Sequence, residues 1–181
     1  MRWAIEMRCQ VRNALATMQF VNFRKKIVSL DALTAWRSTL RASGKKLVVT
    51  NGCFDLLHHG HVIYLEAARN YGDALLVGVN GDASVRELKG EGRPLNAEED
   101  RAAVVAALQS VDCVCIFPER FATRFLALAR PDVYVKGGDY TLETLNQQER
   151  QAVENGGGKI VITPLVPGKS TTALFGKMNA V

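Results

Sequence analysis

The chain has 181 residues, which is enough for one domain with a sizeable core and too few for two ordinary domains joined by a linker. Hydrophobic residues make up 48% of it and charged residues 23%, as in globular proteins. No apolar run approaches the roughly 20 residues that a membrane span requires. We therefore expect a soluble protein that does not contact the membrane.

The formal net charge of +5 is concentrated near the N-terminus. Residues 1–28 carry six of the 23 basic residues and one of the 18 acidic residues, which leaves 17 of each in residues 29–181. Because the remainder is neutral, a nucleic-acid footprint would have to lie in the leader alone. We expect residues 1–28 to be a disordered or extended leader, residues 29–181 to be a single domain, and nucleic acid not to be a partner. A transit peptide is the alternative interpretation of this Arg-rich, acid-poor leader.

Four cysteines, at positions 9, 53, 113 and 115, form neither a CxxC pair nor a disulfide-like framework. Cys113 and Cys115 alternate with Val114, as residues facing the core from a strand do. This usage is typical of a reducing compartment, and we expect a cytoplasmic protein.

From residue 30 onward, helical and strand periodicities alternate along the chain. The first helix is predicted over 30–40, with Gly44 ending it, and a strand over 46–50 follows. The later predicted helices are 60–70, 96–110, 121–130, 142–155 and 171–178, and the later strands are 74–79, 113–117, 133–135 and 159–163. This order indicates an α/β fold, a Rossmann-like doubly wound sheet of about five parallel strands with helices on both faces. Such sheets bind ligands beyond the carboxyl ends of their strands.

The loop after the first predicted strand carries the strongest chemical pattern. His58 and His61 stand three residues apart at the entry to a helix, and Gly60 between them allows a phosphate to approach the backbone closely. Together with free N–H groups of the helix N-terminus, the imidazoles suit a polyphosphate whose charge grows during a reaction. A zinc site that includes Asp55 is an alternative, and His59 fits a surface position. The chain has no GxxxxGK[ST] phosphate-binding loop.

This loop and five later segments resemble motifs of a known family. Asn51–His61 is similar to the signature of the HxGH nucleotidyltransferase superfamily, which includes cytidylyltransferases, pantetheine-phosphate adenylyltransferase and, more distantly, class I aminoacyl-tRNA synthetases. The later segments resemble the adenylyltransferase domain of ADP-heptose synthesis enzymes, which serve lipopolysaccharide core synthesis; they are Val77–Val85, Leu88–Pro94, Glu99–Arg101, Arg130–Tyr140 and Ser170–Thr172. The resemblance covers roughly residues 27–178. It implies transfer of AMP from ATP to D-glycero-β-D-manno-heptose 1-phosphate, with release of pyrophosphate.

The roles that the resemblance implies agree with the chemistry of the residues. The candidate catalytic residues, which would neutralise charge on the phosphates, are His58, His61, Lys46 and Arg101. The candidate nucleotide-binding residues are Gly52, Phe54, Asp55, Gly60, Asn80, Asp82, Gly137, Asp139, Ser170, Thr171 and Thr172. The candidate residues for the sugar phosphate are Lys89, Arg93 and Lys136.

Simpler interpretations remain open for several of these residues. Lys46 also fits a solvated strand end, and Arg101 also fits a salt bridge on a helix. The glycine-rich segment Lys89–Pro94 also fits a surface turn, and Ser170–Thr172 also fits a helix N-cap.

The resemblance implies no nucleophilic residue, because the acceptor's own phosphate attacks the α-phosphorus of ATP. A Mg²⁺ ion would arrive with ATP and be held mainly by substrate phosphates, without a metal site built from protein ligands. ATP and a sugar 1-phosphate are the expected partners, and a homodimer is left open.

Two segments depart from related patterns. Leu165–Gly168 stands where cytidylyltransferases carry Arg-Thr-Glu-Gly, which argues against CTP, and Asn146–Glu149 replaces a Gly-x-Glu-Val pattern found in many heptose adenylyltransferase domains. The alternatives are another acceptor, such as glycerol 3-phosphate, ethanolamine phosphate or FMN, and a catalytically silent nucleotide-binding module.

Overall fold

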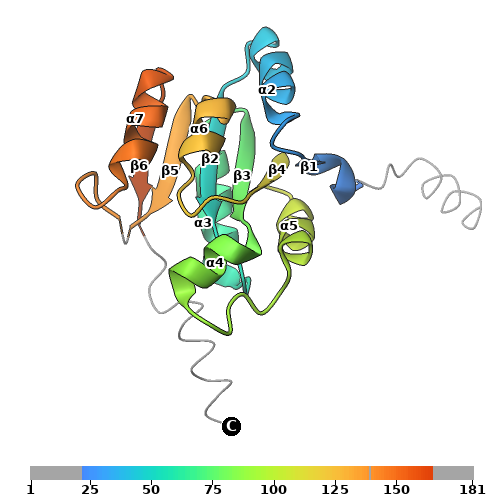
Figure 1. Ribbon diagram of the computed structural model, residues 1–181. Coiled ribbons are helices and arrows are strands. Elements are labelled where there is room, and N and C mark those ends of the chain that lie inside the picture. The colour runs from blue at the N-terminus through green and yellow to red at the C-terminus, as the bar shows by residue number, and fades with distance from the viewer. Residues whose placement is uncertain (1–21, 139, 165–181) are drawn as a thin grey trace, which may run out of the picture.

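One parallel sheet of six strands organises the chain (Figure 1). The structure, a computed structural model, describes residues 22–138 and 140–164. The strands are β1 (Ile27–Val28), β2 (Leu47–Gly52), β3 (Ala74–Asn80), β4 (Cys113–Phe117), β5 (Val133–Gly137) and β6 (Lys159–Thr163). Their order across the sheet is β1-β4-β3-β2-β5-β6, and every neighbouring pair is parallel. The expected α/β fold is confirmed.

Helices cover both faces of this sheet. The described helices are the 3₁₀ helix η1 (Phe23–Lys26) and the α-helices α2 (Leu33–Ala42), α3 (His59–Arg69), α4 (Asp82–Lys89), α5 (Glu98–Ala106), α6 (Thr123–Ala129) and α7 (Gln147–Asn155). Helices α2, α6 and α7 contribute to one hydrophobic cluster, and α3 and α5 contribute to another. None of these helices has the length and apolar character needed to cross a bilayer.

Alternation along the central strands builds the two clusters. In β2, Leu47 and Val49 belong to the cluster of α2, α6 and α7, while Val48 between them belongs to the cluster of α3 and α5. Gly78 in β3 leaves room for the ring of Phe125, because a Cβ atom there would lie 2.7 Å from it. The absence of a side chain at one strand position thus lets α6 pack closely on the sheet.

Three aspartates fix the amino ends of the strands. Asp73, Asp112 and Asp132 each come one residue before a strand, and each carboxylate accepts a backbone N–H at, or one residue before, the start of a neighbouring strand. The acceptor–donor distances are 2.8 Å to Lys46 N, 2.8 Å to Leu75 N and 2.6 Å to Leu47 N. These bonds give hydrogen-bond acceptors to backbone N–H groups at the amino ends of the strands, and they hold these ends next to one another.

The structure differs from the sequence prediction at several boundaries. Ile27–Val28 was assigned to the leader, yet it pairs with β4, and a strand of two residues is too short to show a periodicity. Helix α4 was not predicted. Helix α5 covers Glu98–Ala106, which is shorter than the predicted 96–110. Helix α7 begins at Gln147 rather than at residue 142, because the side chain of Asn146 caps it there. The predicted helix 171–178 and residues 1–21 of the expected leader lie outside the described residues.

Candidate active site

The two histidines of the predicted site lie together where β2 leads into α3. The rings of His58 and His61 stack with their centroids 4.0 Å apart and an angle of 27° between their planes. His58 is the N-cap residue of α3, and buried Gly60 lies in the first turn. The first turn of a helix leaves backbone N–H groups without intrahelical acceptors, so the imidazoles and these amides form one region suited to an anion.

His61 is held as a neutral ring with a defined tautomer. Burial, and then the neighbouring charge of His58, lower the pKa of His61 from 6.5 to about 4. The backbone N–H of His58 donates to Nδ1 of His61 over 3.3 Å. Because Nδ1 accepts, the ring proton lies on Nε2, which makes Nε2–H a hydrogen-bond donor at neutral pH.

Phe54 packs between the end of β2 and the histidines. Its backbone has a φ of +48°, and its ring centroid lies 5.4 Å from that of His61. A Cβ atom at Gly52 would lie 3.1 Å from the Phe54 ring, which is tighter than ordinary contact. Gly52 therefore allows the phenyl ring to lie against the backbone and to fix one side of His61.

Arg101, expected to reach the phosphates, is instead enclosed by protein acceptors. Its side chain is 0% exposed, and Nη2 lies 2.7 Å from an oxygen of Asp82. The guanidinium also donates to three backbone carbonyls, those of Cys53, Asn80 and Asn96, at 2.5, 2.7 and 3.0 Å. Arg101 thus joins the loop after β2, the end of β3 and the segment before α5, and its ion pair is with Asp82 of α4 rather than with a residue of its own helix.

Asn80 and Asp82 are engaged in the same part of the molecule. The side-chain amide of Asn80 donates to Ser84 Oγ over 3.0 Å, and both of these residues are buried. The backbone N–H of Asp82 donates to Glu98 over 2.7 Å. These contacts tie the end of β3 to α4, and the start of α4 to the start of α5.

Asp55 and Arg93 bind each other. Asp55 is buried, and its carboxylate lies 2.6 Å from Nη1 of Arg93. The same carboxylate accepts the backbone N–H groups of Leu95 and Asn96 at 2.7 and 3.2 Å. The segment after α4 is therefore tied onto the loop after β2, which brings the expected sugar-phosphate residue Arg93 to the site through a protein contact.

Lys136 reaches the site from the end of β5, through a network that the sequence prediction missed. Its ammonium group lies 3.3 Å from Oδ1 of Asn51 and 4.3 Å from the centroid of the Tyr140 ring. The Tyr134 hydroxyl lies 2.6 Å from the same Asn51 oxygen and 3.0 Å from Oε2 of Glu149. The other oxygen of Glu149 accepts the backbone N–H of Ala122 over 2.7 Å.

This network is buried and keeps Tyr134 protonated. Lys136, Tyr134 and Glu149 are each at most 6% exposed. Burial, reinforced by the charge of Glu149, raises the pKa of Tyr134 well above its usual value, so its hydroxyl remains a donor. A Tyr and a Lys two apart on a strand share a face, which is the one sequence signal that could have linked them.

The positive charges of Lys89 and Lys136 both act on the thiol of Cys53, in the loop after β2. Burial raises the pKa of the Cys53 thiol, and the positive charges of Lys89, Arg101 and Lys136 oppose this rise. Lys89 is exposed at the end of α4, whereas Lys136 is buried. Two lysines, one at the end of α4 and one in β5, therefore add positive charge to the environment of the loop that precedes His58.

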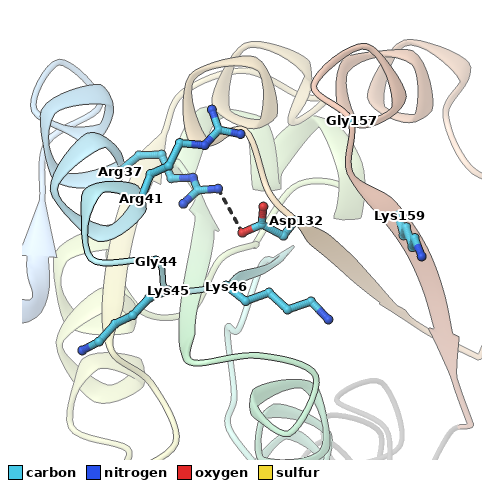
Figure 2. A pocket seen from close by; sticks show the side chains of 8 residues that line it. All are labelled: Arg37, Arg41, Gly44, Lys45, Lys46, Asp132, Gly157 and Lys159. Carbon is cyan, nitrogen blue, oxygen red and sulfur yellow. Dashed lines mark hydrogen bonds and ion pairs between the residues drawn. The ribbon is translucent and has the colours of Figure 1, made fainter.

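Lys46 is the predicted residue that the structure separates from the others. It precedes β2, whereas the histidines follow it, and six strand residues span about 20 Å at roughly 3.3 Å each. Lys46 lies in a pocket with Lys159 and Asp132 at the amino ends of the strands (Figure 2). The expected catalytic role of Lys46 therefore has no geometric support, because Lys46 and the histidines lie beyond opposite ends of β2.

The remaining predicted residues are only partly described. Gly137 ends β5 beside Thr163. Asp139, Ser170, Thr171 and Thr172 lie outside the described residues. Within the described ranges, no group of three or more His, Cys, Asp or Glu side chains is arranged to hold a metal ion.

Comparison with known proteins gives close relatives over most of the chain. The chain is 52% identical over 154 residues to the bifunctional protein HldE of Geotalea uraniireducens, and 45% identical over 168 residues to that of Koribacter versatilis. These matches cover 85% and 93% of this chain but only 31% and 34% of the relatives. The chain thus spans about a third of the length of these relatives.

Two solved structures and a family model also match this chain. The lipopolysaccharide core biosynthesis protein of Thermoplasma volcanium is 27% identical, with a TM-score of 0.56 over 68% of this chain and 98% of its own. Pantoate-beta-alanine ligase of Francisella tularensis, 12% identical with a TM-score of 0.50 over 86% of this chain and 78% of its own, shares the fold alone. The cytidylyltransferase-like family model matches residues 49–173. The chain is accordingly a nucleotidyltransferase that belongs to the cytidylyltransferase-like family.

Proposed function

We propose that the protein transfers AMP from ATP to D-glycero-β-D-manno-heptose 1-phosphate and releases pyrophosphate. The observation that carries this proposal is the stacked pair of His58 and His61 at the N-terminus of α3. The identity of 45–52% to HldE proteins and the likeness to a lipopolysaccharide core biosynthesis protein support the heptose acceptor. ADP-heptose would be the product.

In the proposed reaction, an oxygen of the acceptor phosphate attacks the α-phosphorus of ATP. The bond from the α-phosphorus to the bridging oxygen of the β-phosphate breaks, and pyrophosphate leaves with that oxygen. Nε2–H of neutral His61 and the amides of the first turn of α3 would donate to the phosphate oxygens on which charge accumulates. Lys136 in β5 and Lys89 at the end of α4 would supply further positive charge.

Arg101, Asp55 and the Tyr134 network have a supporting role in this proposal. They fix the positions of the segments after β2, β3 and β5 relative to one another. Groups from several strands would then contact the substrates without rearrangement. Ser170, Thr171 and Thr172 remain expected contacts of the departing pyrophosphate. Mg²⁺ would enter with ATP and neutralise its phosphates, since this ion is commonly held by substrate phosphates with few protein ligands.

The test is a panel of ATP, CTP, GTP and UTP against heptose 1-phosphate, glycerol 3-phosphate, ethanolamine phosphate and FMN, with pyrophosphate release as the readout. We expect kcat/KM for ATP to exceed that for CTP by at least about tenfold, or roughly 1.4 kcal/mol. Equal use of CTP would contradict the adenylyl assignment, and a better acceptor than heptose 1-phosphate would replace the sugar. Absence of turnover with every pair would favour a silent nucleotide-binding module.

A further inference from the structure

A pocket rich in positive charge opens at the amino ends of β2, β5 and β6. It has a volume of about 440 Å³ and lies at the opposite edge of the sheet from His58 and His61. Figure 2 shows the guanidinium groups of Arg37 and Arg41, from α2, on one side and Lys159, from β6, on the other. A ligand of ordinary size fits, because small-molecule sites measure about 300–1,000 Å³.

The charges that line this pocket are unbalanced. The five lining cations are Arg37, Arg41, Lys45, Lys46 and Lys159, and the lining acid is Asp132. Asp132 is already engaged, because one of its oxygens lies 2.9 Å from Nη2 of Arg37 and accepts the backbone N–H of Leu47 over 2.6 Å. Residues 29–181 as a whole carry equal numbers of acidic and basic residues, so the excess in one hollow is a local feature of the fold.

Arg37 is the buried cation among the residues that line this pocket. Its side chain is 4% exposed, and its Nη1 is buried without a hydrogen-bond partner among the described residues. Burial lowers the pKa of Arg37, and the charges of Arg41 and Arg130 lower it further, against the opposing effect of Asp132. A buried donor without an acceptor and a cluster of like charges both reduce stability. One anion seated against the guanidinium would relieve both.

We propose that this pocket is a second ligand site, which binds a small phosphate-bearing anion. Guanidinium groups bind phosphate oxygens through paired N–H donors, and lysines add charge without demanding a fixed geometry. Arg37 is held in place by Asp132 and by the carbonyl of Arg130, to which its Nε donates over 3.1 Å. The site is thus built around a fixed arginine with exposed cations at its rim, and it is independent of the proposed transferase reaction.

The test is a titration of the full chain with inorganic phosphate at constant ionic strength. The backbone amide resonances of Gly44 and Gly157, which line the pocket, serve as the readout in NMR spectra. We expect both to shift with saturation, and to shift in the same way in the His61→Ala variant, whose change lies at the transferase site.

Paired variants separate the pocket from general electrostatics. Arg41→Glu with Lys159→Glu reverses two exposed lining charges, and Arg24→Glu with Lys25→Glu makes the same change in net charge on η1. The pocket pair should weaken phosphate binding by at least about tenfold, and the η1 pair by less than about twofold. The milder Arg41→Gln with Lys159→Gln should show an intermediate loss, which keeps the test valid if the double reversal does not fold.

Three outcomes would overturn the proposal. The first is the absence of saturable shifts at Gly44 and Gly157. The second is equal weakening in the pocket and η1 variants, which would mean non-specific attraction. The third is saturable binding of a glutamate-rich peptide where phosphate does not bind, which would mean that the pocket docks an acidic protein segment.

Discussion

The backbone N–H of His58 donates to Nδ1 of His61, whose ring stacks on that of His58 with the centroids 4.0 Å apart. This contact selects the tautomer that carries its proton on Nε2, while burial keeps the His61 ring neutral. The residue at the N-cap of α3 thereby orients the residue one turn further on. The spacing of three residues matters because it places both side chains at the same helix end.

Replacing His61 with alanine should lower kcat by roughly 10²–10³ while the fold survives, because a donor to the developing charge is lost. The neighbouring His59 is exposed, and His59→Ala is the matched control, expected to retain turnover within about threefold. Pyrophosphate release under saturating substrates measures both. Near-normal turnover of His61→Ala would remove His61 from the catalytic residues.

The imidazole of His61 should titrate at about pH 4, which NMR of the ring resonances measures directly. Its folded-state pKa lies below the unfolded value of 6.5, so the unfolded chain binds this proton more readily. Stability from this group is therefore present above pH 6.5 and is lost as the pH falls towards 4. Urea unfolding of His61→Ala should show a weaker loss between pH 7 and pH 5 than the parent chain, and an equal loss would contradict the assignment.

Arg101→Lys should destabilise the protein by about 2–4 kcal/mol, because at least two buried carbonyls lose a donor at about 1–3 kcal/mol each. Lysine cannot reproduce the planar fork that reaches Cys53, Asn80 and Asp82 together. Chemical denaturation measures the loss. Arg124→Lys, at a side chain 59% exposed, is the control and should change stability by less than about 0.5 kcal/mol. Intact stability with lost turnover would instead indicate direct contact between Arg101 and substrate.

Glu149→Ala should both destabilise the protein and impair catalysis, because it leaves the Ala122 amide and the Tyr134 hydroxyl without this acceptor. We expect a loss of about 2–4 kcal/mol and a lower kcat/KM, since Tyr134 holds the Asn51 oxygen that Lys136 contacts. Glu149→Gln retains hydrogen-bonding atoms and should recover most of both. Glu154→Ala changes an exposed position of the same helix and serves as the control. Full activity of a folded Glu149→Ala would disprove the positioning role.

The sequence alone determined the fold class and the position of the histidine pair at the start of a helix. Short runs such as Leu47–Thr50 and Cys113–Phe117 read as strands because they are buried on both faces, and the fold confirms them. The histidine pair was predictable because both of its members and the glycine between them lie within four consecutive residues, where local geometry decides their placement. Residues this close in sequence need no knowledge of the sheet order.

Tertiary structure decided which polar and charged side chains from distant segments contact each other in the described part of the chain. Asp55 and Arg93 are 38 residues apart, and Asn51 and Tyr134 are 83 apart, so only the docking of separate loops brings them together. Arg101 carries the charge expected of a phosphate ligand, yet its guanidinium donates to three backbone carbonyls that the sequence did not predict. The sequence pattern also did not place Lys46 correctly relative to the histidines, because a side chain's distance from the site depends on which end of a strand it occupies. Local pattern fixes the elements, whereas burial and long-range hydrogen bonding fix what their side chains do.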